Sequence, residues 1–107
     1  MYFESANSLS FVGNYMHDTL GRGRGVYFGY ASGWICTNNT FTNIARTVIY
    51  GYGPTNAVIA NNYLVNCKGQ HGNGISTHGD GTHGCSSITV ARNRVGDSNI
   101  GVTWSYT

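Results

Sequence analysis

The residues best suited to chemistry in this sequence lie in its glycine-rich stretches. The segment His78-Gly-Asp-Gly-Thr-His-Gly-Cys-Ser86 brings His78, Asp80 and His83 into one short loop. Imidazole and carboxylate groups this close are suited to proton transfer, so we predict catalytic roles for all three. The loop has too few ligands for a closed metal site, and we predict none. The alternative is a plain turn with incidental histidines, in which Asp80 bonds to local backbone.

Two further glycine-rich stretches carry much of the positive charge. One contains Arg22 and Arg24, and the other contains Lys68 and His71; three of the six Lys and Arg residues lie in them. Guanidinium groups make bidentate contacts with carboxylates and sulfates. We therefore predict that Arg22, Arg24 and His71 bind substrate, with Lys68 beside them. The alternative is a pair of solvated polar loops.

These stretches interrupt a repeat. One phrase, apolar-x-apolar-x-x-Asn-x-apolar, occurs four times, and its asparagines are spaced by 25, 23 and 31 residues. A self-similar unit of this length is typical of a solenoid. Because an amide both donates and accepts, we expect the repeated asparagines to bond to each other and to the turn backbone. The repeated asparagines are Asn14, Asn39, Asn62 and Asn93, and a second polar column four residues later is Asp18, Asn43, Asn66 and Asp97.

The repeat unit has strand character. Apolar residues alternate with polar ones at a period of two, and β-branched and aromatic residues fill the strands between Gly, Asn and Ser. No stretch has the period of a long helix. The predicted inward columns are Phe11, Cys36, Ile59 and Val90; Met16, Phe41, Leu64 and Val95; and Val26, Val48, Ile75 and Val102.

The Asn phrase followed by Gly-Val or Gly-Ile resembles the right-handed parallel β-helix repeat of the pectate-lyase-like superfamily. The fold class expected is all-β: a right-handed, single-stranded parallel β-helix of about four coils. An immunoglobulin-like sandwich is the main rival. We expect one domain over residues 1–107 and interpret it as a piece of a longer solenoid, because the repeat runs from about Leu9 to Trp104. Uncapped ends of such a piece favour self-association.

The composition bears on which classes of partner this protein could bind. A net charge of +2 is too small to indicate that the protein binds nucleic acid. No apolar run is long enough to form a membrane-spanning segment. The start of the chain lacks the features of a signal peptide. The resemblance implies an extracellular or virion-associated protein that binds or processes an acidic polysaccharide as a lyase or glycoside hydrolase. No cofactor is evident, and Ca²⁺ is implied by the family alone.

The catalytic sets of related families are incomplete here. Alginate-lyase-like members use a Lys with an Arg beside acidic calcium ligands, so the resemblance implies a catalytic role for Lys68 with Arg22 or Arg24, but no group of carboxylates accompanies them. His78-Gly79 resembles the His-Gly element of polygalacturonase-like hydrolases, but the Asp pair is missing, and Val102-Thr103-Trp104 stands where Arg-x-Lys is expected. The alternative function is therefore a non-catalytic shaft of an adhesin or phage tail spike. Sugars would then stack on exposed aromatic rings, with Trp104 among the predicted contacts. The candidate rings are Tyr27, Tyr30, Tyr52, Tyr63 and Trp104.

Overall fold

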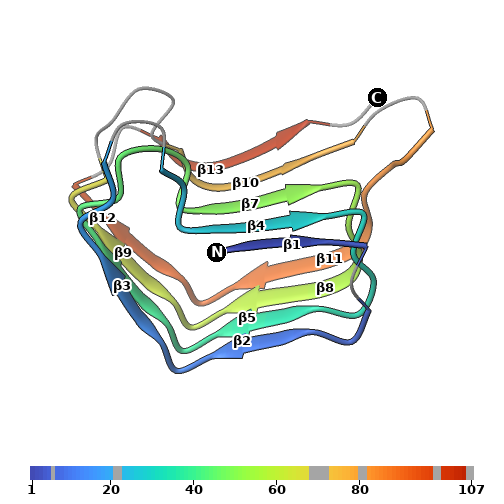
Figure 1. Ribbon diagram of the computed structural model, residues 1–107, viewed down its shortest axis with the longest axis horizontal. Coiled ribbons are helices and arrows are strands. Elements are labelled where there is room, and N and C mark those ends of the chain that lie inside the picture. The colour runs from blue at the N-terminus through green and yellow to red at the C-terminus, as the bar shows by residue number, and fades with distance from the viewer. Residues whose placement is uncertain (6, 21–22, 68–72, 80–81, 98–99, 106–107) are drawn as a thin grey trace.

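The computed structural model describes residues 1–5, 7–20, 23–67, 73–79, 82–97 and 100–105, with only the backbone described at residues 73 and 100–105. Within these residues the chain forms thirteen strands and no helix. The strands belong to three parallel sheets, which we call A, B and C (Figure 1).

Sheet A contains β1 (Tyr2–Glu4), β4 (Val26–Gly29), β7 (Ile49–Tyr52), β10 (Asn73–His78) and β13 (Ile100–Ser105), in that spatial order. Sheet B contains β2 (Ser10–Val12), β5 (Ile35–Thr37), β8 (Thr55–Ala60) and β11 (Ser86–Ala91). Sheet C contains β3 (Tyr15–His17), β6 (Thr40–Thr42), β9 (Tyr63–Val65) and β12 (Arg94–Gly96).

The chain visits the sheets in a fixed order. After β1 it passes through sheets B, C and A in turn, and each circuit adds one strand beside the strand of the previous circuit. We call one such circuit a coil. This all-parallel arrangement is consistent with a parallel β-solenoid. It also excludes the immunoglobulin-like sandwich, whose sheets are antiparallel.

The register confirms two of the three predicted inward columns. Phe11 pairs with Cys36 and its column continues in the predicted register, as does the column that begins at Met16. Val90, the last member of the first column, pairs with Ile59 but is 39% exposed. The third column is wrong in the second coil, where Ile49 rather than Val48 pairs with Val26. Val48 instead lies beside Gly25, where the backbones approach so closely that a Cβ on Gly25 would lie 2.4 Å from the Val48 carbonyl oxygen.

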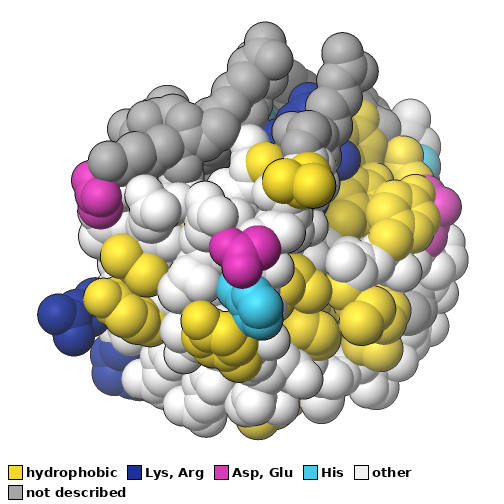
Figure 2. Space-filling model, turned by 60° about the vertical axis from the view of Figure 1, so that its left-hand side comes forward, with side chains coloured by type: hydrophobic (Ala, Val, Ile, Leu, Met, Phe, Trp, Pro, Cys, Tyr) yellow, Lys and Arg dark blue, Asp and Glu magenta, His cyan; other side chains and the backbone are white. Residues whose placement is uncertain are grey.

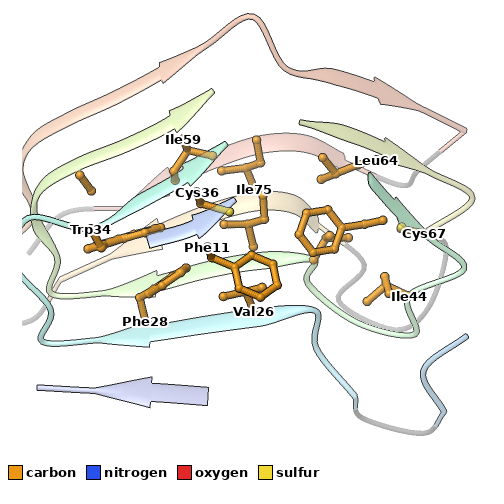
Figure 3. Close-up of a cluster of buried hydrophobic side chains, with 14 of the residues drawn as sticks. Phe11, Val26, Phe28, Trp34, Cys36, Ile44, Ile59, Leu64, Cys67 and Ile75 are labelled. Atoms are coloured by element: carbon orange, nitrogen blue, oxygen red, sulfur yellow. The ribbon is translucent and has the colours of Figure 1, made fainter. Parts of the chain in front are cut away.

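The space between the sheets is filled by apolar side chains from all three (Figure 3). Trp34 is fully buried and stacks on Phe28, with ring centroids 3.6 Å apart. Its ring occupies the space that Gly51 leaves in the inward column of sheet A, since a Cβ on Gly51 would lie 3.3 Å from the Trp34 ring. Cys36 and Cys67 are also fully buried, and the described thiols are all free. Cys67, which directly precedes the stretch with Lys68 and His71, therefore belongs to the core.

The repeated asparagines are connected across the coils. Asn39 donates through its backbone N–H and its Nδ2 to Oδ1 of Asn62, at 3.1 and 3.0 Å. Asn62 donates in the same way to Asn93, at 3.0 and 2.9 Å. The Nδ2 of Asn62 also donates to the Cys36 carbonyl at 2.9 Å. Asn39 and Asn62 are both buried, so these bonds satisfy polar groups that water does not reach.

The corners depend on left-handed backbone. Among the described residues, twelve non-glycine residues and three glycines have positive φ, all between 50° and 71°. The repeated asparagines are not among these residues, because the residue before each of them makes the turn that directs the Asn inward. The fifteen residues form four columns across the coils: Gly13, Asn38, Asn61 and Arg92; Asp18, Asn43, Asn66 and Asp97; Ser8, Gly33, Asn56 and Ser87; and Ser5, Tyr30 and Gly53.

Replacing Asn62 by leucine tests the asparagine row. The isosteric Asn62→Leu change removes the acceptor of Asn39 and the donor to the Cys36 carbonyl, so we expect it to reduce the free energy of unfolding by about 1–3 kcal/mol. Chemical denaturation measures the change. Asn14→Leu is the matched control, because Asn14 is exposed and water can replace its contacts. Equal losses in the two variants would contradict a structural role for the buried amides.

The left-handed corner at Arg92 gives a second prediction. Arg92 has φ of 53°, a conformation that costs an L-residue about 1–2 kcal/mol, while glycine costs about 0.5–1 kcal/mol in unfolded-chain entropy. We therefore expect Arg92→Gly to raise the free energy of unfolding by about 0.5–1 kcal/mol. Arg94→Gly, in strand β12, should lower it. Denaturation curves that move in the same direction for both variants would contradict this account.

Candidate functional site

Three of the predicted site residues have described side chains: Arg24, His78 and His83. The β3–β4 and β9–β10 connections both join sheet C to sheet A, so the two stretches that carry the predicted basic residues leave the same corner, with the β6–β7 connection between them. The remaining predicted site residues, Arg22, Lys68, His71 and Asp80, lie outside the described part of the chain, as does the side chain of Trp104.

Arg24 and His78 both contact a column of tyrosines on the outer face of sheet A. Tyr2, Tyr27 and Tyr50 occupy equivalent positions of β1, β4 and β7. Ring centroids are 4.5 Å apart between Tyr2 and Tyr27 and 5.5 Å apart between Tyr27 and Tyr50, with nearly parallel planes. Burial raises the pKa of Tyr27 to about 12, with a smaller effect from nearby acidic groups. The Tyr27 hydroxyl therefore remains a hydrogen-bond donor at neutral pH.

A glycine makes room for this column. Tyr27 leans along its own strand over Gly29, where an added Cβ would lie 2.8 Å from the Tyr27 ring. The sequence prediction named Tyr27 as a ring face for sugar stacking. In the structure that face is covered by the neighbouring tyrosines, so the ring edge and hydroxyl remain for a ligand.

Arg24 lies over the tyrosine column. Its guanidinium carbon is 4.6 Å from the Tyr50 ring centroid and 5.7 Å from that of Tyr27, the geometry of a cation–π contact. The ion pair of the described residues joins His17 to Asp18, and no described carboxylate pairs with Arg24. The Arg24 Nε is buried and has no hydrogen-bond partner among the described residues. Arg24 is thus a fixed cation with unused donor capacity.

An open hollow of about 320 Å³ lies beside Arg24. Tyrosines line it together with Arg24, so phenolic hydroxyls are available near the guanidinium. A neighbouring hollow of about 300 Å³ extends along Arg24 toward Met1 and Gly23. The lining residues of the first hollow are Tyr2, Arg24, Tyr27, Tyr30, Tyr50 and Tyr52.

The two described histidines border this aromatic surface. His78 stacks on Tyr50 with ring centroids 5.3 Å apart, and its Nε2 lies 2.5 Å from the Ser76 Oγ. Burial lowers the pKa of His78 below its usual value of 6.5, so the imidazole is neutral at pH 7. His83 packs against Tyr30 at 4.3 Å between centroids. We call the surface formed by these two histidines, Arg24 and the tyrosines that line the hollow the tyrosine face.

The sequence prediction missed Tyr2 and Tyr50. A signal for both was present, since each occupies the outward position next to an inward apolar residue of a sheet A strand. Recognising it required the register of β7, which was placed one residue out. Tyr50 also joins two features that the sequence placed in different loops, because Arg24 and His78 both contact its ring.

Sheet C carries a smaller aromatic patch. Figure 2 shows the side on which β3, β9 and β12 lie in Figure 1, with hydrophobic side chains in separate patches among polar ones. Tyr15 is 64% exposed and Tyr63 is 37% exposed, and Arg94 lies over the Tyr63 ring at 4.9 Å. This patch provides an internal comparison for the tyrosine face, because it repeats the Arg-over-Tyr contact without a stacked column.

Among the described residues, no group of three His, Cys, Asp or Glu side chains is placed to hold a metal ion. No helix in the same residues has the length and apolar character to cross a membrane. The sequence matches no protein-family model, no curated protein and no solved structure.

The lowered pKa of His78 predicts acid sensitivity. The folded protein resists protonation of this imidazole, whereas the unfolded chain binds the proton at its ordinary pKa of 6.5. The unfolded state therefore binds more protons just below pH 6.5, and stability falls as the pH decreases through that window. We expect the melting temperature of the His78→Gln variant to depend less on pH than that of the parent protein, between pH 6.5 and the lower pKa of folded His78.

The carboxylate of Asp18 provides a control, because it affects stability in a different pH range from His78. The pKa of Asp18 is lowered by a hydrogen bond from Asn43 and by His17, so its stabilising contribution is lost only below its ordinary value of 3.8. Asp18→Asn should change the pH dependence of melting there and leave the His78 window intact. An unchanged profile near pH 6 in His78→Gln would contradict the role given to His78.

Proposed function

We propose that the chain is a segment of a right-handed parallel β-helix of the pectate-lyase-like kind and that its tyrosine face binds an acidic polysaccharide. The repeated Asn phrase and the three parallel sheets support the fold assignment. The observation that supports the ligand assignment is Arg24, a cation without a described carboxylate partner that is held over Tyr50 beside an open hollow.

The chemistry of the hollow suits an anionic sugar. A guanidinium makes paired hydrogen bonds with the carboxylate of a uronate or with a sulfate ester. The tyrosine hydroxyls on either side recur once per coil, so they can contact hydroxyls on successive sugar units of a chain lying along the coil axis. Sugar rings would then contact tyrosine edges and hydroxyls rather than covered ring faces.

Catalysis on this face would be carried by the histidines. His78 is neutral at pH 7 and can accept a proton, as a lyase or hydrolase requires. His83 lies across the aromatic surface next to Tyr30. Lys68 and Asp80 complete the set predicted from the sequence, and Ca²⁺ is expected through the family resemblance alone. As for other members of this superfamily, we propose an extracellular or virion-associated location.

A non-catalytic shaft, as in an adhesin or phage tail spike, is the second candidate. The observation that favours it is the tyrosine column itself, whose rings cover one another across successive coils and stabilise the coil stack. Such a column strengthens an elongated scaffold whether or not a ligand binds. A shaft would also associate with further copies through its exposed strand edges.

Titration with oligogalacturonate or alginate fragments tests the ligand proposal. Exposed charge contacts contribute about 0–1 kcal/mol each, so we expect weak binding that fades with added salt and weakens up to about fivefold in Arg24→Gln. Arg94→Gln is the matched control, because it removes the same charge from a cation that also lies over a tyrosine ring. Adding Lys68→Ala to the Arg24 variant tests the wider basic edge predicted from the sequence.

The outcomes separate the two candidates. Equal affinities of the parent, Arg24→Gln and Arg94→Gln would overturn the acidic-polysaccharide proposal. Incubation with the polymers then distinguishes catalysis from binding, since a lyase produces unsaturated uronates that absorb ultraviolet light and a hydrolase produces reducing ends. Binding without either product, weakened in Arg24→Gln, would favour the non-catalytic shaft.

A further inference from the structure

The end of the tyrosine column at β1 has features that sugar binding does not need. Tyr2 and Tyr27 are paired residues of adjacent parallel strands, and their rings are only 4° from parallel with centroids 4.5 Å apart. Tyr2 is 62% exposed, so an oxidant in solution can reach it. Because the rings lie face to face, radicals formed on both would have their π systems opposed, the arrangement from which ring carbons couple.

We propose that Tyr2 and Tyr27 are a site of oxidative cross-linking, at which a one-electron oxidant of the heme-peroxidase class joins the two rings as dityrosine. The modification would lock β1 to β4, and therefore the first two strands of sheet A, by a covalent bond. This inference is independent of the proposed polysaccharide binding.

Glu4 provides the proton acceptor. The Tyr2 hydroxyl donates to Oε2 of Glu4 at 3.1 Å. Removing an electron from a phenol makes its hydroxyl proton strongly acidic, so oxidation proceeds most readily where a base already accepts that proton. Among the stacked tyrosines, Tyr2 is therefore the preferred point of oxidation.

Arg24 directs the reaction to the same end. Its guanidinium is closer to Tyr50, at 4.6 Å, than to Tyr27, at 5.7 Å. A fixed positive charge opposes the loss of an electron from the ring next to it. Tyr50 is thus disfavoured as an oxidation site, and Tyr27 is left as the neighbour with which oxidised Tyr2 can couple.

The reaction balances with hydrogen peroxide as the terminal oxidant. Each tyrosine loses one electron and its hydroxyl proton to give a tyrosyl radical. The two radicals form a carbon–carbon bond between ring positions next to the hydroxyls, and the hydrogens at those positions return to the oxygens as the rings regain aromaticity. The net loss of two hydrogen atoms reduces one hydrogen peroxide to two waters.

Other oxidisable side chains are either buried or give products that mass spectrometry distinguishes from dityrosine. The three thiols are buried, with Cys36 and Cys67 fully so and Cys85 7% exposed. Trp34 is fully buried as well. Met1 is 59% exposed, but its oxidation adds oxygen and is distinguished by mass from the loss of two hydrogens.

Treating the 107-residue chain in dilute solution with a heme peroxidase and hydrogen peroxide tests the proposal. We expect dityrosine fluorescence from a monomer that has lost two hydrogens. Cleavage after arginine should then release a cross-linked pair of peptides, residues 1–22 joined to residues 25–46, with fragmentation placing the bond at Tyr2 and Tyr27. Tyr2→Phe keeps the ring stack and should reduce intramolecular dityrosine to background.

Matched variants complete the test. Tyr15→Phe should leave the yield unchanged, because Tyr15 is as exposed as Tyr2 but contacts His17 rather than another tyrosine ring. Glu4→Gln should slow the reaction several-fold, and Arg24→Gln should add a Tyr27–Tyr50 product. Intramolecular dityrosine that persists in Tyr2→Phe, or cross-links found only between molecules, would overturn the proposal.

Discussion

Hydrogen bonding between coils has to continue around corners, and this requirement governs most of the structure. A parallel sheet leaves no backbone N–H unpaired between neighbouring strands, but a chain that turns from one sheet to the next moves its N–H and C=O groups out of line. Here the left-handed residues restore the alignment. The N–H of Asn38 donates to the Ala60 carbonyl on the next coil, and that of Asn43 donates to the Val65 carbonyl, so pairing continues at the turn itself.

This constraint explains which parts of the fold the sequence predicted. The Asn row and two inward columns were predicted correctly because each depends on residue types that only one environment favours: a buried amide that must be satisfied, or a large apolar side chain that must be covered. The third column failed at Val48 because Val48 and Ile49 are both β-branched, both buried and adjacent. Composition cannot distinguish two such neighbours, and only the close approach of Gly25 to the Val48 backbone fixes the register.

The candidate site was predicted less completely for a related reason. Charged and imidazole side chains were identified by chemistry, and Arg24 and His78 do lie together. What brings them together is Tyr50, an outward residue with no distinctive neighbours in the sequence. Its importance comes from lying one coil away from Tyr27, so that a position which is ordinary within one strand becomes part of a continuous aromatic column across three. Stacking between coils cannot be read from any single coil.

The corners have the same structure in coils of different length, and this affects which parts of the sequence can change without disturbing the fold. Successive asparagines are separated by 25, 23 and 31 residues, yet each is hydrogen-bonded through its side chain to the next in one row. The additional residues leave at corners, and the neighbouring strands are paired as if the coils were equal. Segments between β9 and β10 or between β10 and β11 can therefore lengthen, shorten or be exchanged without altering the packing that holds them. New recognition surfaces can then arise on this framework while its stability is left unchanged.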